Sequence, residues 1–408
     1  MPTSFRLLLA AQFVSALADN ALLIVTIALL EQRAMPGWVA PLLKVAFTVS
    51  YVLLAPLVGP LADAVAKARL MAWMNGVKMC GVLALVAGVH PVAAFIVVGL
   101  GAAAYAPAKY GLATELVRPG QLVAANAWIE IATVCAVLLG TGLGGLLVSP
   151  WLLASASRFV DVAFDPVLPS QLILLAVYLL AGVLNIGVPD TGVRRPAASL
   201  GPRALLRDFL ADNRTLWRDP DGGLSLAVTT LFWGVGATLQ FAVLRWAGET
   251  LHLTLDRAAL LQAAVAVGVI AGAVAAGRWV PLEHARRMLI AGILFGLLTS
   301  VVAFVTQLGL AIVLLMIVGA VGGMLVVPLN ALLQDRGNAL LSPGRSIAVQ
   351  GASENAGVLA CLAVYAALVA ADVPLVVLMA GLGVGVAAAV AILLLRQRAH
   401  DRRAGVPA

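Results

Sequence analysis

An Asp-Asn pair, Asp19 and Asn20, lies in the middle of an apolar run that extends from Leu7 to Leu30. An ionised side chain at the centre of a membrane helix costs about 2.5 to 3.5 kcal/mol on the insertion scale, so it usually faces a cavity or a partner. On a helix, Asp19 shares about 60° of arc with three other polar side chains: Gln12, Ser15 and Thr26. We therefore expect Asp19 to line a polar pathway, where a carboxylate can bind a cationic group or carry a proton, and Asn20, about 100° away, to face a neighbouring helix.

Three further charged side chains within or beside apolar runs could contact a ligand. Glu130 and Glu354 each stand in or beside a stripe of polar residues, and Lys109 follows an Ala-Pro-Ala turn. A carboxylate can pair with an ammonium group, and a lysine with a phosphate. Because Glu130 lies close to a helix end, it could instead be hydrated or paired with Lys109. Lys78 is alone in its run, where it could snorkel or pair, and we assign it no function.

A charged turn follows the second apolar run, in the stretch GPLADAVAKARLM at 59–71. Asp63 can cap a helix end there, while Lys67 and Arg69 can interact with helix ends and acidic groups, so we predict a gate that opens and closes during alternating access. A solvated loop with the same charges is the alternative, above all for Lys67. The second half of the chain has basic counterparts without the acid, in the stretch HARRM: Arg286 and Arg287.

Membrane helices are the elements that must position these residues. Of the 408 residues, 62% are hydrophobic and 11% are charged, a balance that soluble domains do not need. Each apolar run has about 20 residues, enough to cross about 30 Å of hydrocarbon as a helix, and none alternates as a membrane strand does. We predict an all-α polytopic membrane protein with twelve transmembrane helices, near residues 7–30, 39–62, 70–89, 93–114, 122–148, 170–189, 223–247, 257–277, 287–306, 308–331, 346–371 and 373–396.

The predicted helices divide into two similar halves. GAAAYAPAKYG at 101–111 aligns with GGMLVVPLNAL at 322–332, and NAWIE at 126–130 aligns with QGASE at 350–354. A parallel repeat of six-helix pseudo-repeats is the architecture of the major facilitator superfamily. The predicted domains are an N-terminal six-helix bundle at 1–190, a cytoplasmic central loop at 191–222, a C-terminal six-helix bundle at 223–396 and a cytoplasmic tail at 397–408.

The distribution of Lys and Arg predicts the orientation. With the N-terminus inside, most basic residues fall in cytoplasmic segments, which places both termini in the cytoplasm. The net charge of +7 follows from this bias and requires no nucleic-acid partner. The first apolar run is longer than that of a signal peptide, so we expect it to be retained. Five basic residues would lie outside: Arg33, Lys44, Arg158, Arg245 and Arg257.

Catalytic and metal-binding patterns are missing from the sequence. It has no GxSxG, no HExxH and no GxxxxGK[ST] stretch, and its nearest His–Asp pair, His252 and Asp256, has three intervening residues rather than the four that acyltransferases use. The three cysteines fall inside predicted helices at spacings that fit neither a metal site nor a disulfide framework. We therefore predict that the protein is not an enzyme and uses no cofactor or metal.

The stretches that carry a family resemblance come from the whole length of the chain and include AQFVSALADNALL at 11–23, APLVGPLAD at 55–63, GAAAYAPAKYG at 101–111 and IAVQGASENAG at 347–357. They resemble the bacterial lysophospholipid transporter family of the major facilitator superfamily. The resemblance implies a flippase that moves lysophosphatidylethanolamine and lysophosphatidylglycerol from the outer to the inner leaflet of the bacterial inner membrane. It implies alternating access with a lateral opening for the acyl chain. It also implies a partner at the cytoplasmic face, an acyltransferase/acyl carrier protein synthetase that re-acylates the lipid.

The same resemblance carries the family's polar residues onto positions of this chain. In the seventh predicted helix Gln240 stands where the family pattern has an arginine. Arg245 lies about 140° around the helix and about 7.5 Å along it from that position, so it is no simple replacement. The predicted substrate-binding residues carried over from the family are Asp19, Asn20, Lys109, Glu354 and Asn355. We add Glu130, from the polar stripe, and Gln240 to this set.

Two other functions stay open on the sequence. A proton-coupled exporter of a small soluble molecule or drug, of the same fold, would use Asp19, Glu130 or Glu354 to carry the proton; its flux would depend on a proton gradient and would not be competed by lysolipid. A non-transporting membrane scaffold for a lipid-modifying enzyme would show no flux when purified.

Overall fold

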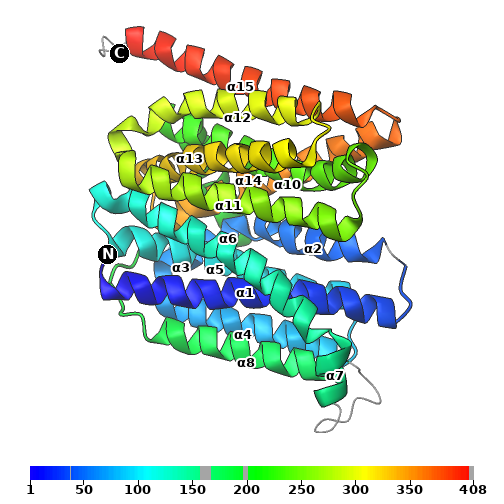
Figure 1. Ribbon diagram of the computed structural model, residues 1–408. Helices are drawn as coiled ribbons and strands as arrows, with labels where there is room; N and C mark the ends of the chain where they lie inside the picture. Colours follow the sequence, from blue (N-terminus) through cyan, green and yellow to red (C-terminus); the bar gives the residue numbers. More distant parts are fainter. Residues whose placement is uncertain (37, 157–166, 196–200, 404–408) are drawn as a thin grey trace. The chain divides into compact units, whose positions relative to one another are not determined.

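The computed structural model describes residues 1–36, 38–156, 167–195 and 201–403 (Figure 1). Within these ranges the chain is helical, with turns and short irregular connections between the helices. Arg158 and residues 404–408 of the predicted tail lie outside the described residues. The helices are α1 (Thr3–Gln32), α2 (Val39–Leu53), α3 (Ala55–Ala64), α4 (Lys67–Val86), α5 (Pro91–Leu116), α6 (Leu122–Leu147), α7 (Pro150–Ala156), α8 (Leu168–Ile186), α9 (Pro202–Arg218), α10 (Pro220–Thr250), α11 (Leu255–Trp279), α12 (Leu289–Val302), α13 (Leu308–Leu340), α14 (Pro343–Ala370) and α15 (Leu375–Arg403), with 3-10 turns η1 (Pro119–Gln121) and η2 (Leu282–Met288).

The chain forms two compact units. Unit 1 comprises residues Met1–Arg118, Ala132–Asp212 and Leu341–Ala352, and unit 2 comprises Pro119–Ile131, Asn213–Leu340 and Ser353–Ala408. Each unit therefore contains one short segment from the other half of the sequence: unit 1 includes the beginning of α14, and unit 2 includes the beginning of α6.

In unit 1, α1 packs against α8 and α5, α4 packs against α5 and α8, and α2 packs against α5. The buried centre is apolar and includes Leu22, Leu43, Phe95 and Leu174. Removing such side chains from water on folding contributes about 1.5 to 3 kcal/mol each in a soluble protein. Between membrane helices, close packing has to supply more of the stability, because lipid tails are as apolar as leucine.

In unit 2, α11 packs along α13, α12 along α15, and α10 contacts α11, α13 and α15. Gly268 and Gly272 of α11 lie directly against the backbone of α13, where a Cβ atom at either position would collide with the carbonyl oxygen of Met316 or Ala320. Small residues at such a crossing let two membrane helices approach closely and gain van der Waals contact.

Eleven helices among the described residues are long and apolar enough to cross a membrane, or twelve if α2 and α3 form one span. The expectation of an all-helical polytopic protein is therefore confirmed. The predicted single helix at 39–62 is instead bent by 64° between α2 and α3. Pro56, at the second position of α3, provides the reason, since it has no N–H to donate to the preceding turn.

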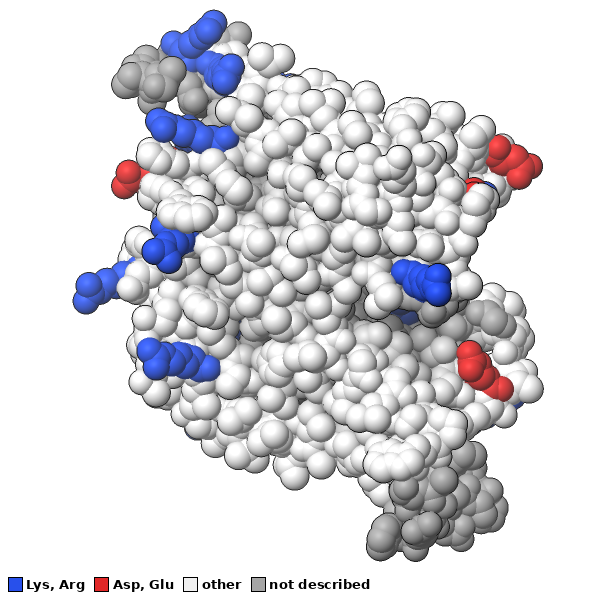
Figure 2. Space-filling model, viewed as in Figure 1, with Lys and Arg blue, Asp and Glu red and all other residues white. Residues whose placement is uncertain are grey.

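Charged side chains are rare along the middle of the helices. In Figure 2 the lysines, arginines, aspartates and glutamates gather towards helix ends, while the surface between is uncharged. Many large apolar side chains are exposed there, including Leu139, Leu179, Leu260 and Val364. An exposed apolar surface of this kind suits lipid rather than water. The polar segment predicted to join the halves is not all irregular, because it contains α9.

Candidate functional site

A buried group of polar side chains lies among α1, α4 and α8 of unit 1. Lys78 Nζ is 2.7 Å from Asp19 Oδ2 and donates to Ser15 Oγ at 3.0 Å. Ser15 Oγ donates to Asn75 Oδ1 at 2.7 Å, and the Tyr178 hydroxyl donates to Asp19 Oδ1 at 2.8 Å. These five residues are called the Asp19–Lys78 cluster below.

Helical spacing assembles this cluster. Ser15 and Asp19 are four residues apart on α1, and Asn75 and Lys78 are three apart on α4, so each pair lies on one helix face. Gly101 of α5 faces the lysine, and a Cβ there would lie only 2.8 Å from Lys78 Cγ. The glycine thus leaves room for a long cationic side chain between α4 and α5.

The two charges of the cluster differ in accessibility. The Lys78 side chain is 2% exposed and that of Asp19 is 17% exposed. A buried ammonium is tolerated only when it is paired and hydrogen-bonded. Lys78 meets both conditions, and its Nζ also lies 5.1 Å and 5.8 Å from the ring centroids of Tyr105 and Tyr178. The site is thus a carboxylate that holds a primary ammonium group and keeps an accessible edge.

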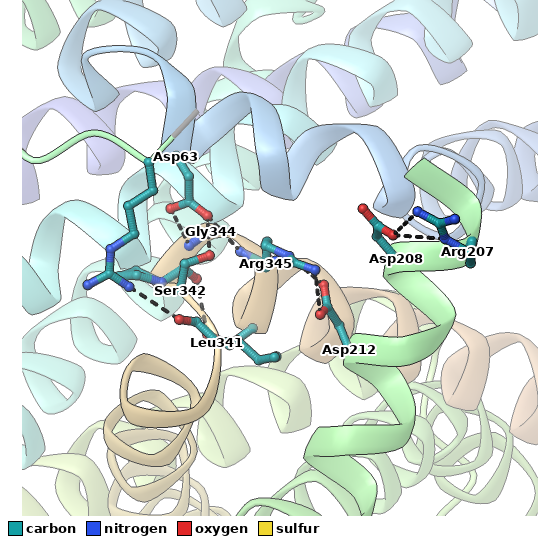
Figure 3. Close-up of polar contacts among 11 residues, drawn as sticks. Asp63, Arg207, Asp208, Asp212, Leu341, Ser342, Gly344 and Arg345 are labelled. Carbon is teal, nitrogen blue, oxygen red and sulfur yellow. Dashed lines mark hydrogen bonds and ion pairs between the residues drawn. The ribbon is translucent and has the colours of Figure 1, made fainter. Parts of the chain in front are cut away.

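Asp63, predicted as a gate residue, binds the beginning of α14 (Figure 3). Its carboxylate accepts from the backbone N–H of Gly344 at 2.9 Å and of Arg345 at 3.2 Å, and from the Ser342 hydroxyl. These are the N–H groups that the first turn of a helix leaves without helical partners, and the positive end of the helix dipole favours the carboxylate. Asp63 is 2% exposed. Asp63 at the end of α3 therefore caps α14, a helix far away in the sequence.

Arg345 links this cap to α9. Its guanidinium makes two hydrogen bonds of 2.6 Å to the Asp212 carboxylate (Figure 3). Burial raises the pKa of the Asp212 carboxyl above its ordinary value, and the bonds from Arg345 offset this only in part. Arg195 also connects Asp63 with the residues just before α14. Its backbone N–H donates to the Asp63 carbonyl at 2.7 Å, and its guanidinium donates to the Leu341 carbonyl at 3.2 Å.

The other predicted gate residues of unit 1 have contrasting positions. Lys67, for which a solvated loop was the alternative, is 4% exposed and lies 2.7 Å from Glu115 of α5. Glu115 also accepts from the Thr191 hydroxyl. Arg69 is exposed and lines a surface hollow beside Asp190. Lys67 is thus a buried ion-pair residue, whereas Arg69 is open to ligands or solvent.

In unit 2 the basic counterparts lie near a second capped helix. Arg286 pairs with Asp221, while Arg287 is exposed. Asp219 caps α10 by accepting from the Gly222 N–H at 2.7 Å, and it receives two bonds from Arg336, of 2.6 and 3.1 Å. Burial acts to raise the pKa of Asp219, but the bonds from Arg336 and Gly222 outweigh it and hold that pKa below its ordinary value.

The predicted substrate-binding residues are divided between the units. In unit 1, Asn20 Nδ2 donates to the Ala16 carbonyl at 2.8 Å, and the Asn20 Cβ lies beside Gly140 of α6. Lys109, also in unit 1, places its Nζ 4.1 Å from the Tyr110 ring centroid. In unit 2, the Gln240 carbonyl accepts from Gln262 Nε2 at 3.0 Å on an exposed part of α10. Glu130 is buried near the beginning of α6, and two residues of α14 are half-buried: Glu354 and Asn355.

Several residues of these clusters were not singled out from the sequence. Lys78 was noted but given no function, and Tyr178, Asp212 and Arg345 were not identified as partners. The available signal was a lone lysine in one apolar run and a lone aspartate in another, which predicts an ion pair whenever the two helices are neighbours. Neighbouring helices are a property of the fold, so the sequence left that pair undetermined.

Comparison with known proteins places the chain among transporters. The family model of the Major Facilitator Superfamily matches residues 8–341. The lysophospholipid transporter LplT of Yersinia pestis (strain Pestoides F) is 41% identical over 370 residues, which cover 90% of this chain and 87% of the relative. The LplT of Yersinia pseudotuberculosis serotype IB (strain PB1/+) has the same identity and coverage.

Solved structures show the same fold at low identity. The human organic anion transporter MFSD10 matches with a TM-score of 0.73 at 19% identity, covering 97% of this chain and 100% of that chain. A bacterial homologue of the iron transporter ferroportin, in an outward-facing state, matches with a TM-score of 0.71 at 15% identity, covering 98% and 100%. At such identities the likeness concerns the fold alone.

Proposed function

Because this chain belongs to the lysophospholipid transporters of the major facilitator superfamily, we propose that it moves lysophosphatidylethanolamine and lysophosphatidylglycerol from the outer to the inner leaflet of a bacterial inner membrane. Membership in this family makes it a multi-pass membrane transporter and not an enzyme. Alternating access with a lateral opening for the acyl chain is the proposed mode, since the cargo has a polar head and an apolar tail that need different surroundings.

The Asp19–Lys78 cluster is the observation that best supports this function, because it offers a binding site for the lipid headgroup. An ethanolamine headgroup ends in a primary ammonium, the same group that Lys78 places 2.7 Å from Asp19 Oδ2. We infer that the headgroup ammonium binds at the accessible edge of Asp19, beside Lys78. Tyr178 would keep its bond to the other carboxylate oxygen, and the lysine would keep its bonds to Asp19 and Ser15.

Lys109 is the proposed contact for the lipid phosphate. It is half-buried, and an ammonium group binds phosphate as a point charge. The remaining predicted residues would line the path of the headgroup in each unit: Asn20, Glu130, Gln240, Glu354 and Asn355.

The contacts of Asp63 are the proposed gate. The N–H groups of Gly344 and Arg345 are held by a carboxylate on another helix, so they can be released and bound again as access alternates. The ion pairs Lys67–Glu115 and Arg286–Asp221 would add to the free-energy difference between the access states. Arg69 and Arg287 would contribute to the same gate from the protein surface.

Location and partnership are part of the same proposal. The excess of Lys and Arg in alternate connections supports cytoplasmic termini. Delivery of a lysolipid to the inner leaflet would supply an acyltransferase/acyl carrier protein synthetase that acts at the cytoplasmic face and restores the second acyl chain.

Reconstitution of the purified protein in liposomes, with a fluorescent lysophosphatidylethanolamine followed between leaflets, tests the proposal. Asp19→Asn should slow movement about tenfold or more, because a hydrogen bond to a charged group contributes about 1.5 to 3 kcal/mol, and Lys109→Ala should also slow it. Asp190→Asn, the same change at an exposed acid of unit 1, is the matched control. Parental rates for both Asp19→Asn and Lys109→Ala at normal levels of protein would refute the assignment.

The same liposomes separate the two other functions. Flux that requires a proton gradient and is not competed by lysophospholipid would indicate an exporter of soluble molecules. Absence of any flux for the purified parent would indicate a scaffold.

A further inference from the structure

We propose that α9 is a binding surface for anionic phospholipids, with its exposed apolar stripe at the boundary of headgroups and acyl chains and its arginines on lipid phosphates. This inference does not rest on the transported substrate, because it concerns the segment that connects the two halves of the sequence.

Three faces can be distinguished on α9. Its buried face consists of Leu205, Asp212 and Leu216, and Phe209 lies beside them. On the opposite side of the helix, about 180° to 240° around from Asp212 at about 100° per residue, stands a row of exposed arginines: Arg203, Arg207, Arg214 and Arg218. Next to this row, within about 40° of arc, lie three exposed apolar side chains: Leu206 at 50%, Leu210 at 59% and Trp217 at 41% exposure.

This pattern is unusual for a helix in water. α9 has 17 residues and a strongly amphipathic sequence, and it is not one of the helices that could cross the membrane. The apolar stripe is neither buried in the protein nor part of a span, and it adjoins a basic row. This combination is characteristic of a helix lying in the membrane interface.

The packing of α9 puts it beside helices that do span. Leu205, Phe209 and Asp212 line a hollow of about 330 Å³ together with Ala55 and Pro56 of α3. Leu57, next to Pro56, is 45% exposed. The Asp212–Arg345 pair also ties α9 to the beginning of α14 (Figure 3), which is one end of a helix long and apolar enough to cross a membrane. Because the ends of such helices lie where lipid headgroups meet the protein, we place α9 at that level.

Charge determines which lipid it fits. The exposed face carries four arginines, and Asp208, a half-exposed aspartate that pairs with Arg207, is the acid nearest to them on α9. Guanidinium groups bind phosphate in a bidentate manner, and clusters of four or more basic residues on an amphipathic helix favour anionic lipids. Anionic glycerophospholipid headgroups are therefore the ligand.

A nitroxide label on Leu210→Cys, in a full-length chain whose three native cysteines are replaced by alanine, tests the proposal by power-saturation spectroscopy. The label should be exposed to a water-soluble nickel relaxant in phosphatidylcholine liposomes. With phosphatidylglycerol present it should become several-fold less accessible to nickel and more accessible to oxygen. Raising the salt from about 0.1 to about 1 M shortens the Debye length from about 10 to about 3 Å and should weaken the change.

Two variants and a second label position serve as controls. Replacing the four arginines by glutamine should abolish the effect of phosphatidylglycerol, whereas replacing them by lysine should retain it. A label on Glu249→Cys, exposed at the far end of α10, should not respond. A nickel-accessible label at position 210 in both lipid compositions, or an unchanged response in the glutamine variant, would overturn the proposal.

Discussion

Asp19 and Lys78 form one ion pair, but removing either side chain leaves a different charge behind. Without Asp19 the remaining charge is an ammonium that is 2% exposed, and without Lys78 it is a carboxylate that is 17% exposed. An uncompensated buried charge costs about 3 to 5 kcal/mol, while replacing both partners by neutral groups is often tolerated. The stability of the cluster therefore depends on which residue is changed.

We predict that Asp19→Asn lowers thermal stability more than Lys78→Met, because the buried lysine loses its partner. The double variant should recover part of the loss, with a coupling of about 0.5 to 3 kcal/mol. Melting of the purified protein in detergent measures this. Additive losses in the double variant would contradict the pairing.

Asp212 and Asp219 should respond to pH in opposite ways. The pKa of Asp219 is lowered on folding, so its ionised form adds stability above the unfolded pKa of 3.8 and this stability is lost as the pH falls through the folded value. The pKa of Asp212 is raised, so its ionised form adds no stability at neutral pH.

We predict that Asp219→Asn lowers the melting temperature at pH 7 and that its difference from the parent shrinks as the pH falls below about 4. Asp212→Asn, the matched change on α9, should lower the melting temperature at pH 7 less than Asp219→Asn does. Melting curves recorded from pH 3 to pH 7 check both; a larger loss for Asp212→Asn would show that the signs are reversed.

At the scale of elements, the cap of α14 is provided by another helix. Replacing a capping aspartate by alanine costs about 1 kcal/mol, whereas asparagine caps nearly as well. We predict that Asp63→Ala increases hydrogen exchange at the beginning of α14 by about fivefold. Asp63→Asn should change it little, and equal exchange in both variants would indicate that the contact does not hold the helix end.

The crossing of α11 and α13 makes a second prediction about elements. Gly272→Ala should destabilise the protein, because the new Cβ would collide with the Ala320 carbonyl oxygen. Gly381→Ala on α15 is the matched control, since nothing lies within 4 Å of a Cβ there. It should be neutral or stabilising by up to about 1 kcal/mol. Melting temperatures that fall equally in the two variants would argue against close packing at residue 272.

For the whole molecule, the proposed orientation rests on the distribution of positive charge rather than on any contact. We predict that a fluorescent protein fused to the C-terminus is fluorescent in the cytoplasm. Alkaline phosphatase inserted after Asp372, in the turn between α14 and α15, should be active outside it. The reverse pattern would invert the proposed direction of transport.

The sequence was sufficient for the number and place of the apolar helices, because the length and hydropathy of a segment are local properties. Stretches resembling a known family also predicted the fold class and the kind of transporter. A single helix was predicted over 39–62, where α2 and α3 are bent, although Pro56 lies two residues after the break. α9 was passed over because its polar residues suggested an irregular connection.

Only the tertiary structure decided which charges meet. Asp19 and Lys78 are 59 residues apart, and Asp212 and Arg345 are 133 apart. Asp63 holds the N–H of Gly344, 281 residues away. A helical pattern gives the face on which a side chain stands but not the neighbour that this face meets, because helix packing depends on the close fit of many side chains at once. The sequence by itself determined the helices, whereas the folded chain determined the ion pairs and caps between them.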